Sequence, residues 1–103
     1  MRESARSSEV RVLGKTYKVR PFQDTLLKTQ AAGANDVKLA LIEYDPQMTK
    51  DQVKDTLLHE IVHILDYDFQ LEMSERQVHC LASGLFSVFK DNPDLSKWIL
   101  TSK

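Results

Sequence analysis

The chain has 103 residues, of which 42% are hydrophobic and 28% are charged, with a formal net charge of −1. This length and balance predict one small folded domain and exclude a globally disordered chain. The absence of a long Lys and Arg run argues against nucleic-acid binding, and no apolar stretch approaches the ~20 residues of a membrane span. The polar N-terminal residues lack the apolar core of a secretory signal, and the lone Cys80 excludes an intrachain disulfide. We therefore expect a cytoplasmic protein that does not enter a membrane.

The first part of the chain is expected to form a tail and a β-hairpin. Residues 1–8 are polar and charged, and we interpret them as a flexible tail. Val10 to Leu13 and Thr16 to Arg20 alternate apolar and polar side chains around Gly14-Lys15, which predicts two antiparallel strands joined by a tight turn.

A third strand is expected in the middle of the chain. Ala31 to Asp36 contains Gly33 and Asn35 and is typical of a turn. Val37 to Tyr44 alternates in the period of a strand, and Asp45-Pro46 ends it.

Three helices are expected to follow the strands, over residues 49–67, 74–90 and 94–100. Both long helices begin with a capping-box pattern, a Thr or Ser followed three residues later by Gln, at Thr49/Gln52 and Ser74/Gln77. Strands first and helices second predict an α+β fold, with a small antiparallel sheet of about three strands followed by the helices.

The first expected helix contains the sequence His59-Glu60-Ile61-Val62-His63. The two histidines are four residues apart and share one face of the helix, and two imidazoles in this arrangement can bind a single zinc ion. Glu60 lies on the flank of that face, where it can accept a proton from a zinc-bound water. The opposite face is apolar and is expected to be buried, with Val53, Leu57, Leu58, Ile61, Val62, Ile64 and Leu65. The pattern therefore predicts a zinc site with His59 and His63 as ligands and Glu60 as general base.

A catalytic zinc site usually has three protein ligands and one open position. On the second helix, Glu75 falls within the apolar stripe and His79 lies at its edge, so both are expected to face the first helix. A carboxylate directed at an apolar face is costly unless a cation meets it, although Glu75 could instead complement the helix N-terminus. His79 could equally be a histidine satisfied by a hydrogen bond, and Asp66 either orients an imidazole or is a surface carboxylate. The stripe comprises Val78, Leu81, Ala82, Leu85, Phe86, Val88 and Phe89.

An HExxH helix followed by a Glu on the next helix resembles the gluzincin metallopeptidases, and the small size and element order are similar to the minigluzincins. More specifically, Thr56 to His63 and Glu75 to Leu85 resemble short HExxH proteins of phages and prophages. Those proteins are similar in style to the SprT-like and ImmA/IrrE metallopeptidase groups. The resemblance covers Val37 to about Pro93.

The resemblance implies that residues 9–103 form a single zincin-like domain and that the protein is a zinc-dependent metallopeptidase acting on a peptide or protein. By position it implies His59, His63 and Glu75 as zinc ligands and Glu60 as general base. It also implies that the strand 37–44 flanks the cleft and pairs with an extended peptide.

Two departures from related patterns leave a second hypothesis open. Phe69 stands where a metzincin has its third histidine. No residue is assigned to stabilise the tetrahedral intermediate, for which Tyr44, Tyr67 and His79 are the candidates. The alternative to an enzyme is a zinc-stabilised binding or regulatory module, in which Glu75 and His79 both bind the metal and close the site.

Overall fold

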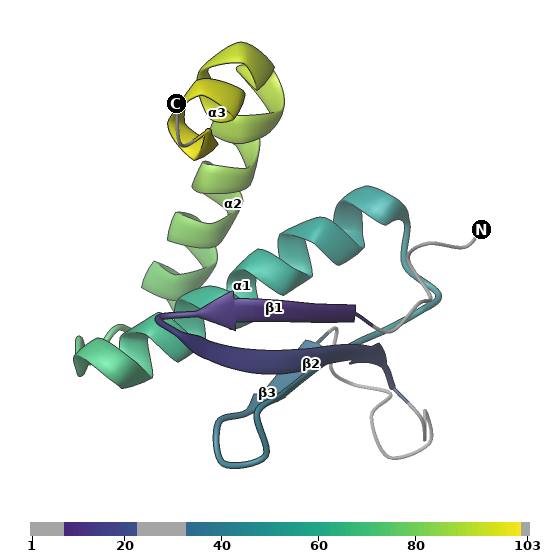
Figure 1. The fold of residues 1–103 in the computed structure, drawn as a ribbon, viewed down its shortest axis with the longest axis vertical. Coiled ribbons are helices and arrows are strands. Elements are labelled where there is room, and N and C mark those ends of the chain that lie inside the picture. Colours follow the sequence, from purple (N-terminus) through teal and green to yellow (C-terminus); the bar gives the residue numbers. More distant parts are fainter. Residues whose placement is uncertain (1–7, 23–32, 102–103) are drawn as a thin grey trace.

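The computed structural model describes residues 8–22 and 33–101, which form a sheet followed by three helices (Figure 1). The predicted α+β fold is confirmed, with four strands instead of about three. The strands are β1 (Ser8–Val12), β2 (Lys15–Pro21), β3 (Gly33–Asp36) and β4 (Leu41–Tyr44). The helices are α1 (Lys50–Phe69), α2 (Glu75–Asp91) and α3 (Pro93–Leu100). None of the helices in the described ranges is long and apolar enough to cross a membrane.

The sheet is mixed, with the strand order β1-β2-β4-β3. The predicted hairpin forms: β1 and β2 are antiparallel, with Val12 opposite Lys15. Its two turn residues are Leu13 and Gly14, one position earlier than the sequence indicates, and both have positive φ values of 51° and 86°. Positive φ at both positions matches the right-handed twist of a two-residue hairpin. β2 then pairs in parallel with β4, so the sheet is not purely antiparallel as expected.

The single strand expected over 37–44 is right only for its second half, which is β4. Its first half is a turn, and the segment before it, which was expected to be a turn, is the strand β3. β3 and β4 form an antiparallel hairpin in which Asp36 pairs with Leu41. The Asp36 Oδ1 accepts a hydrogen bond from the Leu39 N–H at 3.0 Å, and Ala40 adopts a left-handed φ of 55°. Aspartate commonly closes turns in this way. Leu39 is 71% exposed, so the alternation of apolar residues that included it did not indicate a buried strand face.

Helix α1 packs across the sheet and forms the main core. Its N-terminus has the predicted capping box between Thr49 and Gln52, and it extends to Phe69, two residues further than expected. The buried core residues come from β1, β2, β4 and both halves of α1; they are Val12, Tyr17, Val19, Ile42, Tyr44, Val53 and Ile64. This packing fixes which face of α1 turns away from the sheet core.

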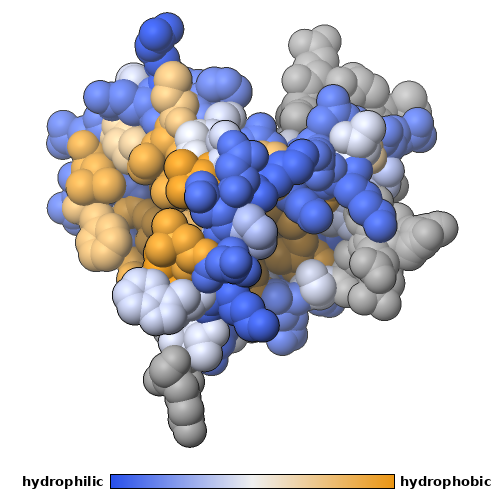
Figure 2. Space-filling model, turned by 90° about the horizontal axis from the view of Figure 1, so that it is seen from above, coloured by the Kyte–Doolittle hydropathy of each residue, from blue (hydrophilic) through white to orange (hydrophobic). Residues whose placement is uncertain are grey.

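Helix α2 contacts α1 and then extends away from the sheet, and α3 packs near its far end (Figure 1). A second, smaller core cluster of Val62, Val78 and Ala82 holds α2 against α1. The apolar stripe expected on α2 is only partly buried, since Leu81 and Val88 are each 46% exposed. Figure 2 shows apolar side chains gathered at the surface on the side of α2 and α3.

Candidate metal centre

The two histidines of α1 lie one above the other on the helix. Their ring centroids are 4.8 Å apart and the rings are inclined by 68°. The side chains of His59 and His63 are 20% and 30% exposed, so both are accessible from solvent while their stems are held by the packed helix. The predicted separation of these histidines from the buried stripe is therefore present in the structure.

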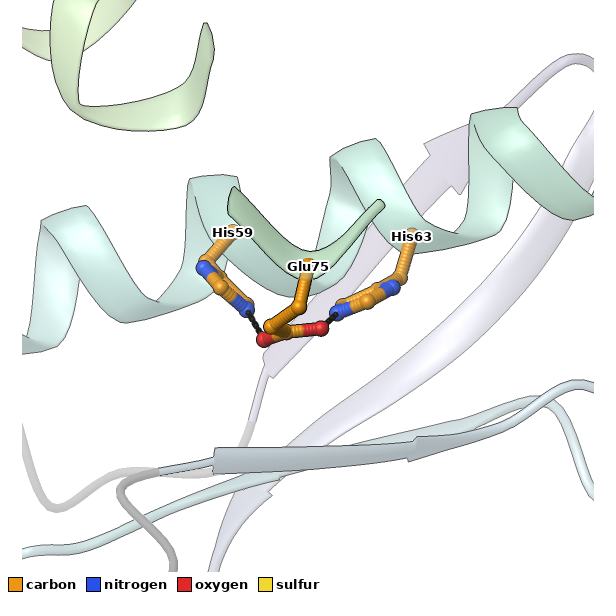
Figure 3. Close-up of side chains that lie close together, drawn as sticks. All are labelled: His59, His63 and Glu75. Carbon is orange, nitrogen blue, oxygen red and sulfur yellow. Dashed lines mark hydrogen bonds and ion pairs between the residues drawn. The ribbon is translucent and has the colours of Figure 1, made fainter. Parts of the chain in front are cut away.

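Glu75, the first residue of α2, places its carboxylate between the two imidazoles (Figure 3). Its Oε2 lies 3.0 Å from the Nε2 of His59, and its Oε1 lies 3.1 Å from the Nε2 of His63. A carboxylate only accepts hydrogen bonds, so the His59 Nε2 is the donor to Glu75, while the His63 Nε2 lies within ion-pair distance of the same carboxylate. A divalent cation can bind between these groups, since both imidazole nitrogens and carboxylate oxygens are zinc ligands.

The spacing of these three side chains fits a metal ion. Their ligand atoms all lie within 4.8 Å of one another. In a tetrahedral zinc site, ligand atoms at about 2.0–2.2 Å from the ion are separated by about 3.3–3.6 Å from one another. The nitrogen–oxygen distances of 3.0 and 3.1 Å are close to that separation, whereas the 4.8 Å limit for the whole group is wider, so the side chains would have to move toward one another around an ion.

The start of α2, and with it Glu75, is held by two local interactions. Ser74 and Gln77 form the predicted capping box. The Asp66 Oδ1 accepts a hydrogen bond from the Met73 N–H at 3.0 Å, which ties the end of α1 to the linker before α2. Asp66 thus binds the backbone of the linker. It does not orient an imidazole, which was one of its two expected roles.

Glu75 lies where it was expected, at the start of α2 and facing α1. The expected reason for a cation beside it, the cost of burying its carboxylate, is wrong. The side chain is 71% exposed, so it carries no burial penalty that a cation would have to offset. His79, the alternative ligand, lies one turn further along α2 and is also exposed. Its ring centroid is 6.2 Å from that of His59, and it does not belong to the group of three ligand atoms.

Glu60 faces the sheet, where it is 95% buried between α1 and β3, with 5% of its surface exposed. Its Oε1 accepts a hydrogen bond from the Asn35 Nδ2 at 2.6 Å. Helix and strand approach closely here: a Cβ added to Gly33 would lie 2.5 Å from the Thr56 Cγ2 and 3.0 Å from the Glu60 Oε2. Only glycine allows this approach without a shift of its neighbours.

A cavity of about 660 Å³ brings these groups together. Of the three candidates for stabilising a tetrahedral intermediate, only His79 reaches it, because Tyr44 is buried in the sheet and Tyr67 lines a different cavity. Among the described lining residues the ionisable side chains are acids and histidines, without Lys or Arg. The lining comprises Gly33, Ala34, Asn35, Asp55, Thr56, His59, Glu60, His63, Glu75 and His79.

Gly33 and Asn35 were not identified from the sequence as site residues. Their spacing of two carries a signal, because alternate residues of a strand face the same side of a sheet. That signal was hidden because the segment was interpreted as a turn. Asp55 was also missed; it lies one turn before His59 and accepts a hydrogen bond from the Ser83 hydroxyl at 3.2 Å.

Comparisons of the chain with models of protein families, with curated proteins and with solved structures give no match.

Proposed function

We propose that this protein is a zinc-dependent metallopeptidase with His59, His63 and Glu75 as zinc ligands and Glu60 as general base. The observation that carries the proposal is the convergence of two imidazole Nε2 atoms and one carboxylate within 4.8 Å. Glu60 lines the same cavity. The absence of Lys and Arg from the described lining supports a cation site, because nothing there repels a divalent ion.

Zinc bound at these ligands would polarise a peptide carbonyl and lower the pKa of a coordinated water toward about 7. Glu60 then takes a proton from the attacking water and delivers it to the leaving amine nitrogen, as general base and then general acid. His79 lies at the cavity and donates a hydrogen bond to the substrate carbonyl oxygen as negative charge develops there.

The edge strand β3 is the element we propose for substrate binding. β4 has neighbours on both sides, β2 and β3, so the strand implied by the resemblance has no free edge. β3 pairs with β4 alone among the described strands, and Gly33, Ala34 and Asn35 line the cavity. An extended peptide pairing with β3 would lie beside Glu60 and the ligands. We also propose a reducing, cytoplasmic setting, because Cys80 is exposed and unpaired.

The test is Glu60→Gln, which keeps the size of the side chain and removes the base. Metal analysis is expected to find one zinc per chain in both wild type and variant, while cleavage of a fluorogenic peptide library falls at least about 100-fold in the variant. A variant that cleaves at the wild-type rate contradicts the role of Glu60, and a wild-type protein without zinc contradicts the proposal as a whole.

A second candidate function is a zinc-stabilised binding module without hydrolytic activity, and the position of His79 is the observation that favours it. His79 lines the same cavity, with its ring centroid 6.2 Å from that of His59, so a movement of its side chain could bring a fourth ligand to the three. His79→Ala separates the two functions. A peptidase retains its zinc and loses activity, whereas a closed four-ligand site loses zinc affinity and melts at a lower temperature.

A further inference from the structure

We infer that Asn35 is a positioning residue that holds the Glu60 carboxylate in one orientation for proton transfer. This inference rests on the proposed peptidase function and adds to it a residue outside the HExxH helix. The hydrogen bond joins β3 to α1 across 25 residues of sequence, from the Asn35 Nδ2 to the Glu60 Oε1 at 2.6 Å.

Asn35 is chemically suited to this contact. An ionised carboxylate has acceptor atoms only, and the asparagine amide nitrogen donates without carrying a charge. It therefore orients the carboxylate without forming an ion pair that would compete with proton transfer. Within residues 8–22 and 33–101, Asn35 provides the one side-chain hydrogen bond to Glu60.

The second oxygen of Glu60 is confined by the same strand. Its Oε2 occupies the space beside Gly33, at 3.0 Å from the position that a Cβ would take. Because Gly33 and Asn35 are alternate residues of β3, the same face of the strand lies beside both oxygens. The carboxylate thus accepts a hydrogen bond at one oxygen, and the backbone of β3 lies beside the other.

A fixed carboxylate matters because glutamate has several rotatable bonds. A base that samples many rotamers spends little time in the geometry that proton transfer requires. The neighbouring backbone of β3 is also the proposed docking edge for the substrate, so one strand would position both the base and the peptide. A mutation at Asn35 should consequently act on turnover and leave metal binding intact.

The experiment compares Asn35→Ala and Asn35→Asp with wild type, each also in the Glu60→Gln background, and with Lys38→Ala as control. Asn35→Asp keeps the size of the side chain and replaces the neutral amide donor with a carboxyl group that repels the Glu60 carboxylate, so it serves if Asn35→Ala does not fold. Lys38 is an exposed residue in the turn of the same hairpin. The measurements are kcat, KM and zinc content on one peptide substrate.

We expect kcat to fall about 10- to 100-fold in both variants, a part of the 10²- to 10⁴-fold contribution of a general base. KM and zinc content should stay within about twofold of wild type, and Lys38→Ala should match wild type. In the Glu60→Gln background, either substitution should lower the residual rate by less than about twofold, since the effects of two residues that act through one step do not add.

Three outcomes overturn the inference. The first is an unchanged kcat in Asn35→Ala or Asn35→Asp, and the second is a loss of zinc or a raised KM that accounts for the whole defect. The third is an additive loss in the Glu60→Gln background. All three outcomes require an active wild-type enzyme. A wild-type protein that cleaves no peptide is a different result, and it overturns both the proposed function and this inference.

Discussion

The Oε2 of Glu75 accepts a hydrogen bond from the Nε2 of His59 at 3.0 Å and so joins the first turn of α2 to the middle of α1. The two residues are 16 positions apart in the chain, and the same carboxylate also reaches His63. The contact depends on the packing of Val62 against Val78 and Ala82, which holds the two helices together. The candidate metal centre is thus part of the interface between α1 and α2.

Removal of the Glu75 carboxylate is expected to abolish stable zinc binding. Glu75→Ala leaves two imidazoles, one ligand fewer than the three of a catalytic site, and zinc affinity should fall at least about 100-fold, more than the 10- to 100-fold typical of an outer-shell loss. Zinc titration with a competing chelator indicator measures the change. Glu72→Ala is the matched control, because Glu72 is an exposed carboxylate in the preceding linker and should bind zinc like wild type. Equal affinity in the two variants would exclude Glu75 as a ligand.

Gly33→Ala is expected to destabilise the protein by about 1–3 kcal/mol, the usual cost of overpacking a close contact. The added Cβ would lie 2.5 Å from the Thr56 Cγ2. Chemical denaturation measures the free energy of unfolding. Thr56→Ser removes the clashing methyl group, so the double variant should recover part of the lost stability. A Gly33→Ala protein as stable as wild type, or no recovery in the double variant, would show that α1 does not approach β3 this closely.

The ion pair between Asp51 and Lys90 joins the first turn of α1 to the last turn of α2 and predicts a defined pH dependence. The hydrogen bond from Lys90 lowers the pKa of Asp51, and the same contact raises the pKa of Lys90. The contribution of Asp51 to stability is therefore present above its unfolded pKa of about 3.9 and is lost as pH falls through the lower folded value. That of Lys90 is present below about 10.4 and is lost as pH rises through the higher folded value.

The measurement for this pair is the melting temperature of wild type and Asp51→Asn across pH. Wild type should melt at a slightly higher temperature between about pH 5 and pH 9, and the difference should shrink as pH falls through the lowered pKa of Asp51, below which both proteins are neutral at position 51. The difference should be small and should shrink with added salt, because both side chains are exposed to solvent. A difference in melting temperature that does not shrink toward acid pH would assign the effect to something other than this ion pair.

Local features of the sequence were sufficient for the helices and for the histidine pair. The capping boxes at Thr49 and Ser74 involve residues three positions apart, and the shared face of His59 and His63 follows from the helical period alone. Both are short-range properties that do not depend on the rest of the fold. The existence of the β1–β2 hairpin was predictable for the same reason, although its turn lies one residue earlier than the sequence indicated.

The remaining features depend on contacts between distant segments, and only the tertiary structure decides them. The alternation of residues 37–44 imitates a strand, yet the Asp36 side chain and the left-handed Ala40 close a turn, which makes β3 the edge strand. The expectation that Glu75 is directed into a buried apolar face was wrong, because it is the first residue of α2 and its side chain is 71% exposed.

The His59–Glu60–His63 sequence by itself determined that two imidazoles share one helix face with a carboxylate on its flank, because the helical repeat requires it. It did not determine which side chains from other elements contact the two histidines and Glu60. Glu75 reaches both imidazoles through the packing of α2 on α1, and Asn35 reaches Glu60 through the close approach of α1 to Gly33. These contacts join residues that are 16 and 25 positions apart in the chain, and no local pattern encodes contacts at such separations.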